Sequence, residues 1–279
     1  MKKIEDAQII QSVRDLCIEA NCCINPDILG AIVTGISIEE SETGQEVLSQ
    51  LVENAEIAKN EGMAICQDTG MVICFVEIGQ EVFVEGNLQD LINEGVRRGY
   101  EEGFLRKSVV SDPLIRCNTG DNTPAIIYFD IVPGDLLKIT IAPKGFGSEN
   151  MSAIKMLKPS DGIEGVIDFV TETCRIAGPN PCPPIVVGVG IGGSFDKCAF
   201  LAKKALLRPV NSKSPLSHIA ELEEVLLKKI NDLGIGPAGL GGRVTALGIN
   251  IETFPTHIAS LPVAVNIGCH VTRHAEVIL

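Results

Sequence analysis

Apolar residues recur at helical spacing through the first 60 residues of the chain. Ile10, Val13 and Cys17 fall three or four positions apart, which places them on one face of a helix. Pro26 suits the first turn of a second helix, because proline lacks the N–H that a helix start leaves unbonded. A third helical pattern covers residues 46–60, and a glycine two positions later can end it. The N-terminal region is therefore predicted to be helical.

From Met63 the pattern changes to short apolar runs that are typical of strands. MAIC and MVICFVEI flank the residues QDTG, whose Asp and Gly are common turn formers. Helical spacing returns over residues 88–102. Two further apolar runs, AIIYFDIV and LLKITIAP, are joined by a Pro-Gly-Asp sequence, which predicts a β-hairpin.

Helical and strand patterns alternate in the C-terminal half. We expect helices at 160–176, 194–207 and 217–233, and strands at 185–189, 245–252 and 262–267. No internal repeat, low-complexity tract or linker separates these segments. The mixture of hairpins and helices favours an α+β fold, with mixed β-sheets surrounded by helices and a helical N-terminal region, in a single domain over residues 1–279.

Composition and charge restrict the partners of the chain. With 279 residues, 45% of them hydrophobic, it can bury a substantial core. No stretch approaches the roughly 18 to 20 uncharged apolar residues of a membrane span, and the start, MKKIEDAQII, has acids where a signal peptide would be apolar. The net charge of −13 disfavours nucleic acid and anionic membranes. We expect a cytoplasmic protein without nucleic-acid or membrane partners.

The cysteines argue against a disulfide framework, and any metal ligands among them would be scattered along the chain. Ten are present, and without a secretory signal we expect a reducing compartment. No CxxC occurs, which excludes a zinc ribbon and a thioredoxin-like motif, so metal ligands would have to come from distant segments. Cys66, Cys182 and Cys269 differ from the others because each stands at an element end beside turn formers.

A glycine run offers a rival interpretation. Gly188, Gly190 and Gly193 match the dinucleotide-binding pattern GxGxxG between a predicted strand and a predicted helix, as in an NAD-binding dehydrogenase. That fold wants an acid about 20 residues further on, but the corresponding region reads ALLRPVNSKSPL. The other interpretation is a tight turn with close packing of the helix on the strand.

Six motifs together resemble one known family. They are AICQDTG, FLRKS, CNTGDNTPA, APKGFGSEN, GPNPCPPIVVGVGIGG and FPTHIASLPVAVNIGCHVTRHA. The chain resembles the iron-sulfur-dependent class I fumarases and the related tartrate dehydratases. This resemblance implies a 4Fe-4S cluster held by three cysteines, with one iron lacking a protein ligand. The matching positions are Cys66, Cys182 and Cys269.

The same resemblance implies roles for residues around the cluster. Gln67 and Asp68 would face the substrate, Arg106 would contact a substrate carboxylate, His257 would line the pocket, and Gly147 would offer a backbone contact. Asp68 and His257 are thus the candidate catalytic residues. An Arg suits a planar carboxylate because its donors form a fixed fork. Without the resemblance, the Asp would be interpreted as a turn former and the Arg as a solvated charge.

Two histidines near the C-terminus invite a metal interpretation. His270 and His274 are four positions apart, the spacing of a two-histidine zinc face, but no Glu stands between them. We interpret them as structural or subunit-contact residues.

The resemblance also implies a partner. Fused family members continue past the RHA motif into a second domain with further basic residues and a proposed catalytic threonine, whereas this chain corresponds to their N-terminal half and stops at Leu279. It implies a separate β subunit that completes the active site, in an α2β2 assembly.

The sequence therefore predicts the α subunit of an iron-sulfur fumarate hydratase that interconverts fumarate and malate. The alternative is a tartrate or methylfumarate-type dehydratase, because these small dicarboxylates differ by groups worth only about 1 to 3 kcal/mol in a pocket. An NAD-binding dehydrogenase and a non-catalytic iron-sulfur sensor are the interpretations from other classes.

Overall fold

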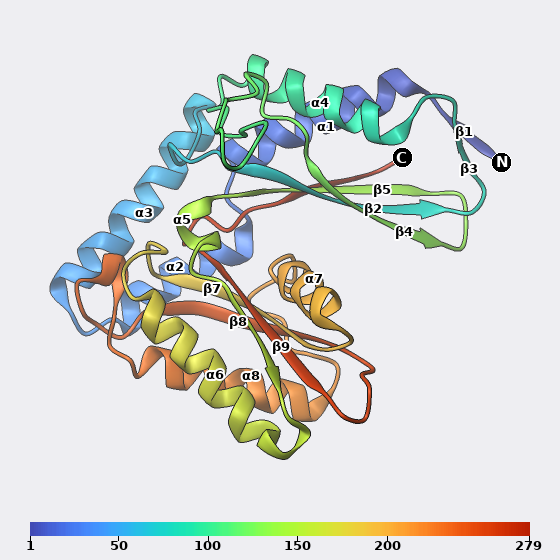
Figure 1. The fold of residues 1–279 in the computed structure, drawn as a ribbon. Helices are drawn as coiled ribbons and strands as arrows, with labels where there is room; N and C mark the ends of the chain where they lie inside the picture. The colour runs from blue at the N-terminus through green and yellow to red at the C-terminus, as the bar shows by residue number, and fades with distance from the viewer. The chain divides into compact units, whose positions relative to one another are not determined.

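The computed structural model describes residues 1–279 and divides them into two compact units, each built from segments that are distant in sequence (Figure 1). Unit 1 comprises Met1–Ile24, Ala55–Phe146 and Arg273–Leu279, and unit 2 comprises Asn25–Asn54 and Gly147–Thr272. Each unit has its own mixed sheet and its own helices, so the predicted α+β fold is confirmed. The single domain over 1–279 stays a prediction.

Unit 1 is built on a four-stranded sheet in the order β10-β5-β2-β4. In this sheet β2 is antiparallel to β5 and parallel to β4, and β10 is antiparallel to β5. A separate parallel pair joins β1 and β3. The elements are β1 (Lys2–Ile4), α1 (Asp6–Cys22), the end of α3 (Glu42–Glu61), β2 (Met71–Gly79), β3 (Val82–Val84), α4 (Leu88–Glu102), β4 (Ile126–Val132), β5 (Leu137–Lys144) and β10 (Ala275–Ile278).

Helices α1 and α4 lie side by side and cover one face of this sheet (Figure 1). Alternate strand residues point to that face, as the period of two requires, and Val72, Cys74 and Val76 of β2 are buried there against Val13 of α1 and Val96 of α4. Burying this apolar face in one cluster holds the first helix and the sheet together.

Unit 2 contains a second four-stranded sheet in the order β6-β9-β7-β8, in which β7 is parallel to β8 and antiparallel to β9. Helices α6 and α8 pack on one face, and α7 packs on the other. Its elements are α2 (Pro26–Ile38), the start of α3, β6 (Ala153–Leu157), η1 (Pro159–Asp161), α6 (Gly162–Ala177), β7 (Ile185–Gly192), α7 (Phe195–Ala205), α8 (Ser217–Asn231), η2 (Pro237–Gly239), β8 (Ala246–Phe254) and β9 (Leu261–Gly268). The short α5 (Phe146–Glu149) stands where the chain passes from unit 1 to unit 2.

The glycine run of β7 serves helix packing. A Cβ at Gly188 would lie 2.1 Å from the Ala202 carbonyl oxygen, and one at Gly190 would lie 2.0 Å from that of Cys198. Both carbonyls belong to α7, so these glycines allow the helix to rest directly on the strand. Gly188 and Gly190 lie within the strand rather than in the turn that would face a pyrophosphate. The interpretation as close strand-helix packing is therefore the one that the structure supports.

Two local predictions are wrong. MAIC is not a strand, because its residues follow the end of α3 as turn and coil before β2 begins at Met71. The runs that form β4 and β5 do not make a hairpin, because β2 lies between them and bonds to both. The Pro-Gly-Asp connection instead bonds to the turn between β2 and β3, where Glu81 N donates to the Gly134 carbonyl at 2.9 Å.

One apolar stretch exceeds what we expected from the sequence. The span Asp6–Ile38 contains an 18-residue window of mean hydropathy 1.4, which could cross a membrane by length and composition. The span is interrupted at residues 23–25, so it consists of α1, with 17 residues, and α2, with 13. The helices also belong to different units. This stretch is weak evidence for a membrane segment.

A buried carboxylate joins the α2–α3 corner to a distant loop of unit 2. Glu39 is 3% exposed, and its oxygens accept hydrogen bonds from the backbone N–H groups of Glu40, Ser41, Arg243 and Val244, at 2.8 to 3.0 Å. Burial alone would raise the pKa of Glu39, but these four donors outweigh it and hold the pKa below its usual value. The ionised side chain therefore stabilises the folded state.

We expect Glu39→Gln to lower the free energy of unfolding at pH 7 by on the order of 2 kcal/mol, because the amide turns an N–H toward backbone donors. Because the folded pKa lies below the unfolded one, the wild-type contribution is complete above the unfolded value of about 4.3 and is lost as the pH falls through the folded pKa. Urea unfolding at pH 7 and near pH 3 measures this difference.

The matched control is Glu40→Gln. Glu40 is exposed and pairs with Arg243 at the surface, so its replacement should change stability little at either pH. A wild-type advantage over Glu39→Gln that is the same at both pH values would contradict the assignment.

Candidate functional site

The first predicted ligand, Cys66, stands in a turn that precedes β2 in unit 1. The turn begins where Ile65 N donates to the Asn21 carbonyl of α1 at 2.9 Å. The Asp68 backbone N–H points at the Cys66 sulfur, 3.4 Å away, and the Cys66 thiol reaches Gln67 Oε1 at 3.4 Å. Hydrogen bonds directed at the sulfur ligands are one of the features that tune iron-sulfur clusters.

Asp68 holds this turn against the loop after β5. Its Oδ1 accepts a hydrogen bond from Gly70 N at 3.0 Å, and its Oδ2 accepts one from Phe146 N at 2.9 Å. The Asp68 carbonyl accepts from Nη2 of Arg273, a buried residue, at 2.7 Å. Asp68 therefore has a structural role, because it holds the turn against the loop after β5. In any catalytic role it would act through the carboxylate lone pairs that these hydrogen bonds do not use.

Three further residues tie the turn to the segment that carries Arg106. Thr69 Oγ1 donates to the Arg106 carbonyl at 2.8 Å. Asn122, which is fully buried at a φ of 64°, donates from Nδ2 to the Gly70 carbonyl at 3.1 Å and accepts from Ser108 N at 2.7 Å. Tyr100, also buried, donates its hydroxyl proton to the Thr69 carbonyl at 2.6 Å. The turn and the Arg106 segment thus form one hydrogen-bonded platform.

The platform borders a cavity of about 500 Å³ in unit 1. Cys66, Gln67 and Arg106 line it, so the structure brings three of the predicted site residues together around one space. Met63 and Phe104 also contribute to its wall. Asp68 does not line this cavity, because its carboxylate faces Gly70 and Phe146 instead.

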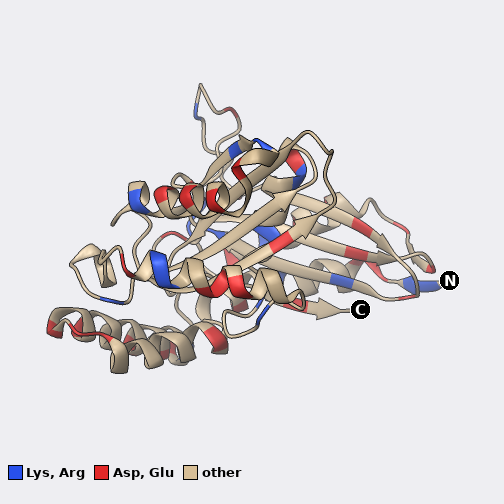
Figure 2. Ribbon diagram, turned by 90° about the horizontal axis from the view of Figure 1, so that it is seen from below, with Lys and Arg blue, Asp and Glu red and all other residues tan.

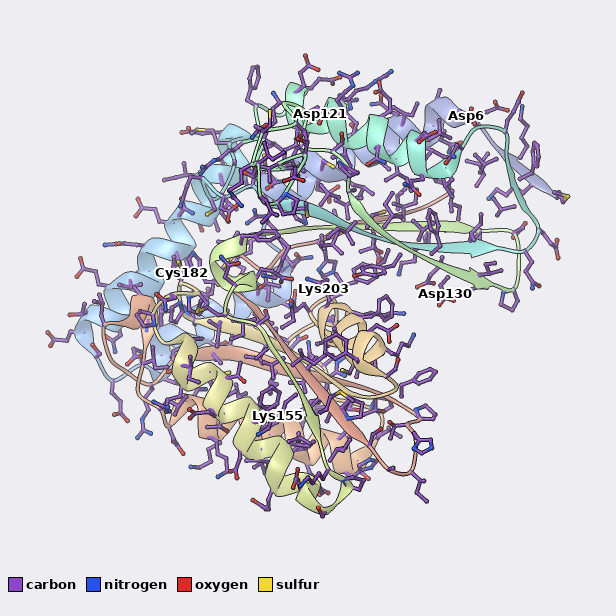
Figure 3. All side chains as sticks on the ribbon, viewed as in Figure 1. Asp6, Asp121, Asp130, Lys155, Cys182 and Lys203 are labelled. Carbon is purple, nitrogen blue, oxygen red and sulfur yellow. The ribbon has the colours of Figure 1, made fainter.

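In unit 2 the sheet brings two other predicted ligands to one edge. Cys182 lies in the loop before β7, where Figure 3 labels it, and Cys269 follows the last residue of β9. β7 and β9 run antiparallel with Val186 opposite Gly268, so the start of one strand lies beside the end of the other. The pairing therefore places both cysteine-bearing loops at the same end of the sheet.

Hydrogen bonds fix both loops. Cys182 has a φ of 56°, unusual for a residue with a side chain, and its carbonyl accepts from His270 Nδ1 at 3.0 Å. Thr272 Oγ1 donates to the Cys269 carbonyl at 2.8 Å, and a Cβ on Gly268 would lie only 2.1 Å from that hydroxyl oxygen. His270 thus has the structural role that its spacing left open.

The remaining predicted residues of unit 2 are exposed. His257 lies in the turn between β8 and β9, where its Nδ1 accepts from Ala259 N at 3.2 Å, and the residue is exposed. Gly147 lies in α5, and a Cβ there would meet nothing nearer than the Asn180 carbonyl oxygen, at 3.7 Å. A side chain at 147 would therefore fit within this chain, so packing does not explain the glycine.

Burial separates the predicted ligands from most of the other cysteines. None of the ten cysteines forms a disulfide, and Cys66, Cys182 and Cys269 are at least partly exposed. Five others are buried, namely Cys17, Cys22, Cys74, Cys174 and Cys198. Burial raises the pKa of each of these thiols, and that of Cys174 rises to about 12. A buried neutral thiol is a poor metal ligand, so the donor set of the three predicted positions fits an iron-sulfur cluster better than these five do.

The structure contains no group of three or more His, Cys, Asp or Glu side chains that could hold a metal ion by itself. Cys66 belongs to unit 1, whereas Cys182 and Cys269 belong to unit 2. Ligation of one cluster by all three cysteines stays a prediction.

Comparison with known proteins decides the family. The family model described as fumarate hydratase (Fumerase) matches residues 10–278. The chain belongs to the fumarate hydratase family. It is 46% identical over 275 residues to a protein of Methanocaldococcus jannaschii provisionally named L(+)-tartrate dehydratase subunit alpha, with 96% of each chain covered. Proteins named L(+)-tartrate dehydratase subunit alpha from Escherichia coli and Shigella sonnei are 36% and 35% identical, over 86% of this chain and 80% of each relative.

The predicted membership of this hydro-lyase family is therefore confirmed. Sequence reasoning missed the buried residues that hold the Cys66 turn in place, above all Asn122, Tyr100 and Arg273. Asn122 stands inside the motif CNTGDNTPA and Arg273 inside VTRHA. A sequence pattern alone does not say that an Asn or an Arg will be buried against a turn.

We expect Cys66→Ser, Cys182→Ser and Cys269→Ser each to lower the iron bound per chain after anaerobic reconstitution. The serine hydroxyl oxygen is a much weaker ligand for this cluster than the cysteine thiolate. Cys117→Ser is the matched control, since Cys117 is also exposed and, although it begins the motif CNTGDNTPA, is not one of the three predicted ligands. Iron and sulfide analysis, with the visible absorption of the cluster, measures the result. Full cluster content in any of the three variants, or loss of the cluster in Cys117→Ser, would contradict the ligand assignment.

Proposed function

We propose that this chain is the α subunit of an iron-sulfur dehydratase that removes water from a small hydroxylated dicarboxylate, with L(+)-tartrate as the first candidate substrate. The observation that carries the proposal is the cavity in which Cys66, a predicted cluster ligand, lies with Gln67 and Arg106. The choice of tartrate rests on the names of relatives that are 35% to 46% identical to this chain.

The proposed cofactor is a 4Fe-4S cluster held by Cys66, Cys182 and Cys269, with one iron that has no protein ligand. When bound, it would supply a Lewis acid that eases departure of a substrate hydroxyl as water. The accessible thiols and the N–H directed at the Cys66 sulfur support this assignment.

The residues of the chain would bind and orient the substrate. The Arg106 guanidinium would hold one carboxylate through its two parallel donors, with the Gln67 amide beside it and the Gly147 backbone as a further contact. His257 and Asp68 are the proposed catalytic residues. With its Nδ1 accepting from Ala259 N, His257 would present an Nε2–H donor to the substrate. Asp68 keeps its carboxylate fixed by two backbone donors, so it would act with little reorganisation.

The reaction breaks two bonds on adjacent carbons. A base takes the proton from the carbon next to one carboxylate, and the C–H electrons form the new carbon-carbon double bond. The C–O bond on the other carbon breaks, and the oxygen leaves as water with a proton from the protein or solvent. From tartrate the product is an enol, which becomes a 2-oxo dicarboxylate, whereas from malate it is fumarate.

Fumarate hydration is the second candidate, favoured by the description of the family model that covers residues 10–278. The hydroxylated compounds of the two reactions, tartrate and malate, differ by one hydroxyl. Discrimination between them depends on a few polar contacts in the pocket. We further propose a cytoplasmic location and an α2β2 assembly, in which a separate β subunit supplies the remaining cations. The relatives' names include the words subunit alpha, which supports a second subunit.

We expect the isolated chain with its cluster to have almost no dehydratase activity, because a dicarboxylate must be held at both ends while its proton is removed. Purified β subunit from the same organism should restore activity and saturate near one to one. The assay is anaerobic turnover of L(+)-tartrate, malate and fumarate, and we expect the highest kcat/KM with L(+)-tartrate.

Three results would count against this proposal. Full turnover by the isolated chain would exclude a shared active site. A higher kcat/KM with fumarate would replace tartrate by the second candidate. A stable cluster without turnover of any dicarboxylate, with or without the β subunit, would favour an iron-sulfur sensor.

We expect Arg106→Lys to lose nearly as much activity as Arg106→Ala, because an ammonium group cannot reproduce a forked contact with a carboxylate. Loss of one charge-assisted contact corresponds to a fall in kcat/KM of roughly 10- to 150-fold. The control is Arg175→Lys, at an exposed pair with Glu172 on α6. Steady-state kinetics of the complex measure the effect, and normal kinetics in Arg106→Lys would remove Arg106 from the site.

A further inference from the structure

Phe104 has a backbone conformation that its side chain does not favour. Its φ is 52°, in the left-handed region that glycine or asparagine normally takes after a helix. It follows α4, where Phe104 N donates to the Glu101 carbonyl at 3.2 Å and Leu105 N donates to the Tyr100 carbonyl at 3.0 Å. These bonds require the left-handed turn, but they do not require a phenylalanine.

Packing within the chain does not compensate for this choice. The Phe104 side chain is 95% exposed, so its ring is in contact with water. A bulky residue with positive φ costs free energy relative to glycine or asparagine, and such residues persist mainly at functional sites. The large, exposed and strained aromatic residue therefore calls for a contact outside this chain.

The position of Phe104 indicates what that contact would cover. Phe104 and Met63, which is 55% exposed, line the same cavity as Cys66, Gln67 and Arg106. Both apolar residues therefore lie at the mouth of the proposed substrate cavity. A partner that buries them would also exclude water from that cavity.

Charge indicates the chemistry of the partner. Glu61 is exposed two positions from Met63, and the exposed acids Glu101 and Glu102 near Phe104 pair with Arg97 and Arg14, but the whole chain carries a net charge of −13. Figure 2 shows Lys and Arg positions scattered along the ribbon among the Asp and Glu positions. A second copy of the chain would bring the same negative charge, whereas a basic partner would complement the net negative charge and add cations for a dicarboxylate.

We propose that Phe104 and Met63 form an apolar docking site for the β subunit, whose basic surface surrounds an apolar contact and covers the mouth of the cavity. This inference rests on the proposed function, because that function requires a second subunit with cations. Phe104 is then the anchor of the interface, since buried aromatic residues at the centre of an interface contribute most to affinity.

The test replaces the strained aromatic residue by one that suits the turn. Phe104→Asn should raise the Tm of the isolated cluster-loaded chain by about 2 to 4 °C, because asparagine tolerates the left-handed region. The same variant should weaken binding of purified β subunit by at least about 30-fold. Met63→Ser should also weaken binding. Ile176→Ala is the matched control, because Ile176 is 66% exposed on α6 and does not line the cavity.

Affinity is measured without oxygen by sedimentation or biolayer interferometry, and cluster content is measured in every sample. Unchanged β-subunit affinity in Phe104→Asn, or an equal loss in Ile176→Ala, would overturn the docking site, and so would failure of the two wild-type chains to associate. Self-association of the isolated chain that Phe104→Asn abolishes would assign the surface to a second copy instead. A wild-type complex that forms through Phe104 but turns over no dicarboxylate would refute the proposed function and leave the docking site intact.

Discussion

The turn that carries Cys66 can lie against the end of β5 only because residue 70 has no side chain. A Cβ on Gly70 would come within 2.7 to 2.8 Å of three backbone atoms of Lys144, and its φ of 73° is one that glycine adopts without strain. With this contact in place, Asp68 can reach the Phe146 N–H, and Asn122 and Tyr100 can bond to the carbonyls of Gly70 and Thr69. The cavity wall in unit 1 thus depends on the close backbone contact that the absence of a side chain at Gly70 allows.

In unit 2 the pairing of strands, rather than a tight turn, positions the cysteines. There the antiparallel pairing of β7 with β9 determines which loops meet, and glycines within β7 allow α7 to approach the opposite face. His270 and Thr272 then fix the cysteine loops through the carbonyls of Cys182 and Cys269. In unit 2 the two cysteine residues are thus held through their carbonyls, whereas in unit 1 the Asp68 N–H bonds directly to the Cys66 sulfur. Such pre-organisation reduces the cost of assembling a metal site.

Strong local signals predicted much of the fold, and non-local pairing explains the failures. The periodic segment at residues 88–102 coincides with α4, and Pro26 begins α2 as expected, because helix patterns and caps act over a few residues. The hairpin of β4 and β5 failed because β2, more than 45 residues earlier, takes the place between them. MAIC failed because an apolar run alone does not specify a strand. Turn residues such as Cys66 were recognisable from sequence, whereas buried Asn122 and Arg273 depend on tertiary packing that no local pattern encodes.

The discontinuous make-up of both units bears on the order of events during synthesis. Strand β10, from the last residues of the chain, pairs with β5 in unit 1. In unit 2 the Glu39 carboxylate accepts hydrogen bonds from the backbone of Arg243 and Val244, which are synthesised about 200 residues later. Helix α2 is therefore synthesised long before β8, the strand on which it packs. Until that strand follows, the apolar face of α2 has no final partner, so unit 2 can complete its fold only late in synthesis.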